Sequence, residues 1–449
     1  MYKNKIKYHE VKVFFIENKD RVFLNLSLLS MLCLSYLGHL ETINFNLYFG
    51  ELHGIFCDFF SGKTKTNLSH PVWGYGFLIY LFKNPISLIA IQYLLFIISV
   101  NLLYNYFRKW SINLTYLKVL IFSSLPIIFL HSQLWPKSIV SSLVVISVIQ
   151  LLKYLENNKN FYLFSSFLLL SISLHFRSDY YFLIHFIIVI LFLFKKIEFY
   201  KLCFILFMSH LVILPWGLYN LKNNNKYIET SSNMGHVLIL GLGQLPNNLW
   251  GITPKDGDPI FNQMIHEKFY NNVKSTDVEV NDFLKGKFMN LITDNPLEYI
   301  KKVIYASKLY FMDPFYIGNL DNFRMNSSSY ISDLRSAESS FYDLNLKDGF
   351  IYLKKTLDKV NTLVFIKIIV SLLTKLIGYL IIILTIYSIA KNFRKIISNV
   401  QVFILFLIII YQFLISVFAF HMPAYTTSIY LIFVFLLSHL KYFPLPNEK

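Results

Sequence analysis

The amino-acid sequence predicts an all-α membrane protein with many transmembrane helices. Of its 449 residues, 55% are hydrophobic and 15% are charged, whereas in an average soluble domain about a quarter of the residues are charged. The mean hydropathy is +0.49. The hydrophobic residues also gather in long uncharged runs. This arrangement excludes a set of ordinary soluble domains, although the length alone would allow them.

Uncharged runs of 17 to 25 residues supply the strongest predicted spans. About 20 helical residues cross the hydrocarbon core of a bilayer, and backbone amides in lipid need partners within their own segment. The strong runs are Pro85–Phe107, Val119–Trp135, Leu202–Leu221, Ile396–Phe420 and Met422–Leu440. Weaker runs are Val22–Leu40, Ser138–Tyr154, Phe161–Phe176, Tyr180–Phe194 and Ile366–Ala390. Together they predict a bundle of about ten spans.

The distribution of Lys and Arg predicts the orientation of these spans. Residues 1–21 are rich in Lys, and cytoplasmic loops carry an excess of basic residues, so we expect a cytoplasmic N-terminus. The net charge of +16 is then a feature of membrane topology and anionic lipid contact, not of nucleic-acid binding. The apolar stretch Val72–Phe82 is too short to span. We assign it to an interfacial or re-entrant helix on the outer side.

Three parts follow the N-terminus in this interpretation. Residues 22–219 form an N-terminal transmembrane module whose first outer loop is 41–71. Residues 220–361 form an extracytoplasmic segment with interfacial helices, and 362–449 form a C-terminal transmembrane module. Residues 220–360 hold 16 basic and 16 acidic side chains, so the segment is near neutral while the rest of the chain carries the positive excess. We expect a bacterial cytoplasmic membrane protein whose site faces outward.

Two kinds of site find no support in the sequence. No GxxxxGK[ST] motif occurs, and Gly241 and Gly243 lack the context of a dinucleotide-binding fold. Cys33, Cys57 and Cys203 are scattered, without the spacing of zinc ligands or of a disulfide framework. Nucleotide sugars and ATP are therefore not expected as direct substrates.

The first outer loop holds the first cluster of polar residues. Glu51 or Asp58 could act as a general base on an acceptor hydroxyl or amine. Lys63, Lys65 and His70 could balance the charge of a leaving phosphate. The alternative interpretation of this loop is an ordinary solvated surface.

Further polar clusters lie near the ends of predicted spans. Arg177 could bind a phosphate with Asp179 orienting it, or the pair could only mark the membrane boundary. Trp216 and Asn220 follow Pro215, and a Pro-Trp pair at a span's end is typical of an interfacial Trp and a helix that stops at Pro. His421 lies between the last two spans, where a lone His is usually a boundary residue. Asp179, Trp216, Asn220 and His421 are also candidate substrate-binding residues.

In this order the clusters resemble the GT-C glycosyltransferases, and most closely the family 39 type, which holds protein O-mannosyltransferases and lipid A aminoarabinose transferases. The resemblance covers most of residues 22–440 and depends on several short motifs. They are Glu51 or Asp58 before His70-Pro71, Arg177-Ser178-Asp179, Pro215–Asn220 before the glycines of Gly235–Gly243, and Asn295-Pro296. Tyr219 and Ala424 stand where the family has Arg, and 131–137 lacks an acid that relatives often place there.

The resemblance implies an inverting sugar transfer from a polyprenyl-phosphate carrier to a glycan, lipid or protein acceptor. Glu51 is the first choice for the base and Asp58 the second. His70, Lys63, Lys65 and Arg177 are candidates for the phosphate. Residues 220–360 would cover the site and select the acceptor. No bound cofactor is required, and the missing acid leaves a divalent metal unsupported.

Other functions remain open at this stage. A polysaccharide polymerase or ligase also uses polyprenyl-linked glycans, but it would depend on Arg and His rather than on Glu51 or Asp58. A transporter or flippase would be expected to show inverted repeats and acids within its spans, and neither is evident. A scaffold that kept the fold and lost the chemistry is the third alternative.

Overall fold

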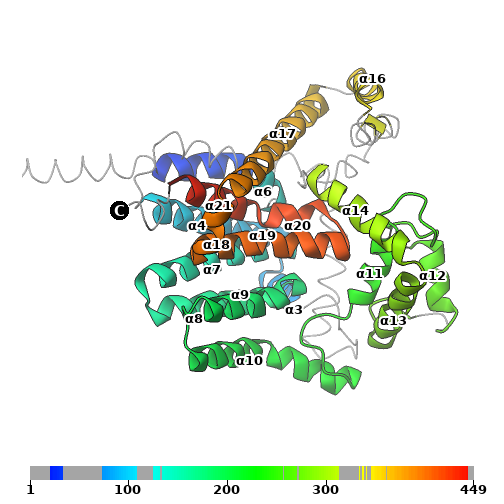
Figure 1. Ribbon diagram of the computed structural model, residues 1–449. Coiled ribbons are helices and arrows are strands. Elements are labelled where there is room, and N and C mark those ends of the chain that lie inside the picture. Colours follow the sequence, from blue (N-terminus) through cyan, green and yellow to red (C-terminus); the bar gives the residue numbers. More distant parts are fainter. Residues whose placement is uncertain are drawn as a thin grey trace, which may run out of the picture.

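The chain is described by a computed structural model (Figure 1). Helix accounts for 82% of the described residues, and no strand occurs among them, so the predicted all-helical fold class is confirmed. The structure describes residues 21–33, 73–108, 125–131, 134–255, 257–269, 273–312, 333, 336–337, 340, 345–359 and 362–442.

The N-terminal module is a layered bundle of helices. Helix α7 packs against α4 and α8, and α10 packs against the far side of α8. Ser147 on α7 donates a hydrogen bond to the Ser166 carbonyl on α8 at 2.9 Å, and such small residues let two helices approach closely. The helices are Arg21–Cys33, α3 (Trp73–Phe82), α4 (Pro85–Arg108), α6 (Leu125–His131), α7 (Pro136–Asn157), α8 (Asn160–Leu174), the 3₁₀ turn η1 (Ser178–Tyr180), α9 (Tyr181–Leu193) and α10 (Phe199–Asn224).

The C-terminal module completes the bundle. Helix α19 packs against α14 and α21, and α17 packs against α21. In Figure 1, α17 runs obliquely away from the layers formed by α7 to α10. The helices are α17 (Thr362–Lys391), α18 (Phe393–Ser398), α19 (Val400–Phe418), α20 (Pro423–Ser428) and α21 (Tyr430–Tyr442).

Four of the described helices are long and apolar enough to cross a membrane: Pro85–Phe107 within α4, α7, α10 and α19. Many apolar side chains point away from the bundle, among them Phe186 and Phe207. Exposure of such side chains to lipid costs little free energy, whereas their exposure to water is unfavourable. The chain is therefore a helical, membrane-embedded protein, and the total of ten crossings stays a prediction.

The predicted segment 220–361, called here the polar segment, carries its own small core. Ile239, Phe261 and Leu284 belong to this core, and α11 packs against α13. Figure 1 shows these helices grouped at one end of the bundle. The group consists of α11 (Met234–Leu242), α12 (Pro259–His266), α13 (Val278–Asp294) and α14 (Pro296–Met312), while α16 (Leu346–Leu357) lies apart from it, beside the end of α17.

The expectation that Pro215 stops its helix is wrong. Helix α10 continues through Pro215 to Asn224. Proline is tolerated inside transmembrane helices because neighbouring groups can satisfy the freed backbone carbonyl. The helix end is fixed further on, where Asn225 adopts the left-handed conformation at φ 52°.

Two predicted spans are interrupted. The run Ile396–Phe420 divides at Asn399, whose side-chain oxygen accepts hydrogen bonds from the backbone of Gln401 at 2.9 Å and Val402 at 3.3 Å. This is an N-cap, and it starts α19 anew. The run Met422–Leu440 begins with the short helix α20 before α21 starts. The absence of charge, which defined these runs, does not detect such interruptions, because all the residues involved are uncharged.

Candidate functional site

A cavity of about 570 Å³ lies between the bundle and the polar segment. The turn between α8 and α9 forms one part of its wall, and the chain 226–234 and α13 form another. Residues of α19 and the turn after it close a third side. The cavity therefore lies where an apolar bundle meets a polar cover, which is where a ligand with a lipid part and a polar part would fit.

Arg177 and Asp179 line this cavity as a two-point ion pair. Arg177 Nε donates to Asp179 Oδ2 at 2.7 Å, and Nη2 donates to Oδ1 at 3.2 Å. Both side chains are mostly buried. The structure thus brings the two predicted residues together as a pair, and a guanidinium held in this way is suited to phosphate or carboxylate recognition.

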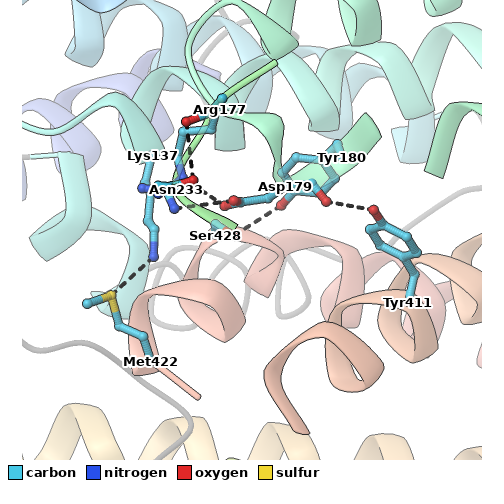
Figure 2. A network of polar contacts seen from close by, with 9 residues as sticks. Lys137, Arg177, Asp179, Tyr180, Asn233, Tyr411, Met422 and Ser428 are labelled. Atoms are coloured by element: carbon cyan, nitrogen blue, oxygen red, sulfur yellow. Dashed lines mark hydrogen bonds and ion pairs between the residues drawn. The ribbon is translucent and has the colours of Figure 1, made fainter. Parts of the chain in front are cut away.

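The turn that carries this pair is fixed to the C-terminal helices (Figure 2). The hydroxyl of Tyr411 on α19 donates to the backbone carbonyl of Asp179 at 2.7 Å. The hydroxyls of Tyr180 and Ser428 lie 3.1 Å apart. Ser141 on α7 also donates to the Ser428 carbonyl at 2.7 Å. Helices α19 and α20 therefore bond to η1 directly, and α7 supports α20, so the site is positioned by rigid elements.

Lys137 is a cation near this pair that the sequence did not single out. It lies at the start of α7 with 2% of its surface exposed, and Nζ donates to the Met422 sulfur at 3.3 Å (Figure 2). Nζ also lies 4.7 Å from the centre of the Trp135 ring. Lys137 does not line the cavity in the described part of the chain, so it lies behind the wall that carries the ion pair.

Short polar side chains form the wall beside these charges. Thr230, Ser231, Ser232 and Asn233 all line the cavity. Ser231 Oγ donates to Asn233 Oδ1 at 3.2 Å, and Ser232 Oγ donates to the Thr276 carbonyl at 2.5 Å. Hydroxyl and amide groups both donate and accept hydrogen bonds, as a sugar requires.

Trp216 and Asn220 support this wall from behind. Trp216 Nε1 donates to the Thr230 carbonyl at 2.7 Å, and Asn220 Nδ2 donates to the Ile228 carbonyl at 3.0 Å. Tyr219 stacks on Trp216 with ring centres 5.2 Å apart. Neither Trp216 nor Asn220 lines the cavity in the described part of the chain. They position the residues that do.

His421 lies in the turn that forms the edge of the cavity on the side of α19 and α20. Its backbone N–H donates to Gln244 Oε1 at 2.8 Å, and Gln244 Nε2 returns a bond to the His421 carbonyl at 2.8 Å. The ring lies against Tyr310 with centres 5.9 Å apart. The preceding Phe420 lines the cavity, and the following Met422 contacts Lys137. His421 thus joins the polar segment to the turn before α20.

The remaining predicted site residues fall outside the described ranges. These are Glu51, Asp58, Lys63, Lys65 and His70, all in the first outer loop. The described part of the chain resumes at Trp73, the first residue of α3. Trp73 Nε1 donates to His175 Nδ1 at 3.0 Å, and the Gly74 N–H donates to the His175 carbonyl at 2.8 Å. The start of α3 is therefore anchored to His175, two residues before Arg177.

Glu229 is a second residue that the sequence analysis missed. The hydroxyl of Tyr181 donates to Glu229 Oε2 at 2.5 Å, and that of Tyr227 donates to Oε1 at 3.1 Å. His210 Nδ1 lies 3.3 Å from Oε1. Both tyrosines line the cavity, so the carboxylate orients two of its hydroxyl groups. The sequence signal is an acid directly before the polar run Thr230–Asn233.

Comparison with known proteins gives no assignment. No protein-family model, no curated protein and no solved structure matches the chain. The site must therefore be interpreted from its own chemistry.

Proposed function

We propose that the chain is a membrane glycosyltransferase that takes a sugar from a polyprenyl-phosphate carrier and gives it to a glycan, lipid or protein acceptor. The observation that supports it best is the cavity that joins the mostly buried guanidinium of Arg177 to a hydroxyl-rich wall at the edge of an apolar bundle. In this proposal the protein lies in a bacterial cytoplasmic membrane, and the cavity opens to the outer side.

The phosphate of the carrier would bind at Arg177, which lines the cavity, while Lys137 lies enclosed behind the cavity wall. Both side chains are mostly removed from water, so electrostatic attraction between a cation and an anion is stronger here than in water. The fork of Arg177 adds direction to that attraction. Thr230, Ser231 and Asn233 would face the sugar.

The lipid tail of the carrier would lie along α9. Phe182 lines the cavity and is exposed on its other side. Phe186, Val189 and Leu193 are exposed as well, and their spacing of three and four residues puts them on one face of the helix with Phe182. This apolar stripe leads from the cavity along the bundle surface, as a polyprenyl chain would require.

The proposed reaction is a direct displacement with inversion. The acceptor oxygen or nitrogen forms a bond to the anomeric carbon while the bond from that carbon to the phosphate oxygen breaks. The electron pair leaves with polyprenyl phosphate, whose charge Arg177 and Lys137 stabilise. The acceptor proton passes to the carboxylate of Glu51 or Asp58. The proposal needs no bound cofactor.

Transfer by the purified full-length chain tests this function. The chain is reconstituted with a polyprenyl-phosphate sugar and candidate acceptors, and released polyprenyl phosphate is measured. We expect release only with the correct acceptor, with loss in Arg177→Gln and in the double variant Glu51→Gln/Asp58→Asn. Arg394→Gln removes an exposed Arg on α18 and should retain full activity.

The same assay separates the alternatives. A polymerase or ligase would keep its turnover in Glu51→Gln/Asp58→Asn and would extend a glycan chain. A flippase would move the labelled carrier across the bilayer without releasing polyprenyl phosphate. Either result would refute the proposed sugar transfer.

A further inference from the structure

We propose that Lys226 and Lys285 form a second phosphate-binding subsite in the cavity. This inference extends the proposed function, because it assigns a second anionic group to the substrates. That group would be a phosphate ester on the acceptor or the second phosphate of a pyrophosphate-linked carrier. Both sources present the same chemistry to the two lysines.

The subsite contains two cations that share one carboxylate. Lys226 follows α10 and pairs with Asp282 of α13, and Lys285 Nζ lies 3.3 Å from the other oxygen of Asp282. All three residues line the cavity. Burial lowers the pKa of Lys285, which means that its ammonium lies in partly dry surroundings where an anionic partner is favoured. The cluster retains one positive charge beyond what Asp282 neutralises.

Buried contacts fix this cluster at the cavity. Asn281 precedes Asp282 and is 2% exposed, and its Oδ1 accepts a hydrogen bond from the Gly235 N–H at 2.7 Å. Leu284, next to Lys285, is fully buried in the core of the polar segment. Helix α13 therefore cannot turn Lys285 away from the cavity without disrupting that core.

The two cationic clusters belong to different parts of the protein. Arg177 and Asp179 come from the bundle, whereas Lys226, Lys285 and Asp282 come from the polar segment and the chain entering it. The hydroxyl-rich run 230–233 lines the same cavity. One anion held by the bundle and a second held by the cover would place a sugar against that wall.

Binding of short carriers tests the subsite directly. The full-length chain in lipid nanodiscs is titrated with farnesyl phosphate, farnesyl pyrophosphate and inorganic phosphate. The test variant is Lys226→Gln/Lys285→Gln. The matched control, Lys222→Gln/Lys287→Gln, removes the same charge from the same two helical regions, at residues that do not line the cavity in the described part of the chain.

If the second phosphate belongs to the carrier, farnesyl pyrophosphate binds about tenfold more tightly than farnesyl phosphate, and only the test variant loses this preference. If it belongs to the acceptor, inorganic phosphate binds beside saturating farnesyl phosphate, and only the test variant loses this second site. The proposal is overturned if neither behaviour appears in the wild type, or if the test variant behaves like its control.

Failure of the proposed sugar transfer gives a different result. Farnesyl phosphate binding would then be unchanged in Arg177→Gln, while the effect of Lys226→Gln/Lys285→Gln on phosphate could still be present. The two hypotheses are therefore judged by different variants.

Discussion

Burial of charge is the main feature of the site at the scale of single residues. Lys137 is almost fully enclosed, and Arg177 and Asp179 are mostly so. Removing charged groups from water costs several kcal/mol unless partners compensate. Asp179 pairs with Arg177 through two hydrogen bonds, whereas Lys137 donates to the Met422 sulfur and lies near the Trp135 ring. Such an arrangement is costly for a purely structural role and is useful for binding an anion.

Replacement of Lys137 by Met tests this interpretation. Met preserves an unbranched chain of similar length and removes the charge, so we expect the fold to survive and the affinity for farnesyl phosphate to fall about tenfold, or ~1.4 kcal/mol. Lys153→Met, near the other end of α7, is the control. Equal affinities in the two variants, measured by titration in nanodiscs, would mean that Lys137 has no part in binding.

Some site residues could be predicted and others could not. Arg177 and Asp179 are charged residues between apolar runs, and this contrast made them visible in the sequence. Lys137 gave a weaker signal, as a single charge at the start of an apolar run. Glu229 and Lys285 lie in a segment with balanced charge, where only the folded structure brings them to the cavity or its wall.

At the scale of helices, close contacts at glycine explain how the polar segment is assembled. A Cβ added to Gly235 on α11 would collide with the backbone carbonyl of Asn281 on α13. Gly286 on α13 has nothing within 4 Å of such a Cβ. The two positions therefore respond in opposite ways to the same substitution.

We expect Gly235→Ala to lower the thermal unfolding midpoint, because α11 must move away from α13. Gly286→Ala should raise the stability by about 0.5–1 kcal/mol through helix propensity. Differential scanning fluorimetry of the two detergent-solubilised variants makes the comparison. A stabilising effect of Gly235→Ala would contradict the described packing of these two helices.

Helix existence was easier to predict than helix boundaries. The run Pro85–Phe107 corresponds to α4, and Leu202–Leu221 lies within α10. The break at Asn399 depends on a cap that uses an uncharged side chain, and the absence of charge that defined the run does not register it. The passage through Pro215 depends on tertiary support, which overrides the local preference of proline to end a helix.

At the scale of the whole molecule, Lys302 fastens the polar segment to the bundle. It lies on α14, and its Nζ donates to the carbonyls of Val417 at 2.8 Å, Phe418 at 3.2 Å and Ala419 at 2.8 Å. These are carbonyls at the C-terminal end of α19, where a cation is favoured by the helix dipole. The same contact keeps Ala419 and Phe420 at the edge of the cavity.

The burial of Lys302, which disfavours its charged form, predicts a pH dependence of stability. Burial lowers the pKa of Lys302 to about 7, from 10.5 in the unfolded chain. Above pH 7 the unfolded state binds more protons than the native state, so the free energy of unfolding rises with pH until the unfolded pKa is reached. Between pH 7 and 9 the gain is about 2 kcal/mol.

The measurement compares unfolding of the wild type with Lys302→Met across this pH range. The difference between them should increase in favour of the wild type as pH rises. Lys301→Met, at the exposed neighbouring position, should follow the wild type. A constant difference between wild type and Lys302→Met would show that Lys302 titrates alike in both states.

The lipid that copurifies with the protein tests the central claim most directly. Native mass spectrometry of the gently solubilised chain should detect a bound polyprenyl phosphate, with or without its sugar, in the wild type and in Arg394→Gln, and should detect little of it in Arg177→Gln. Bulk phospholipids alone in all three samples, even after addition of the carrier, would contradict the account.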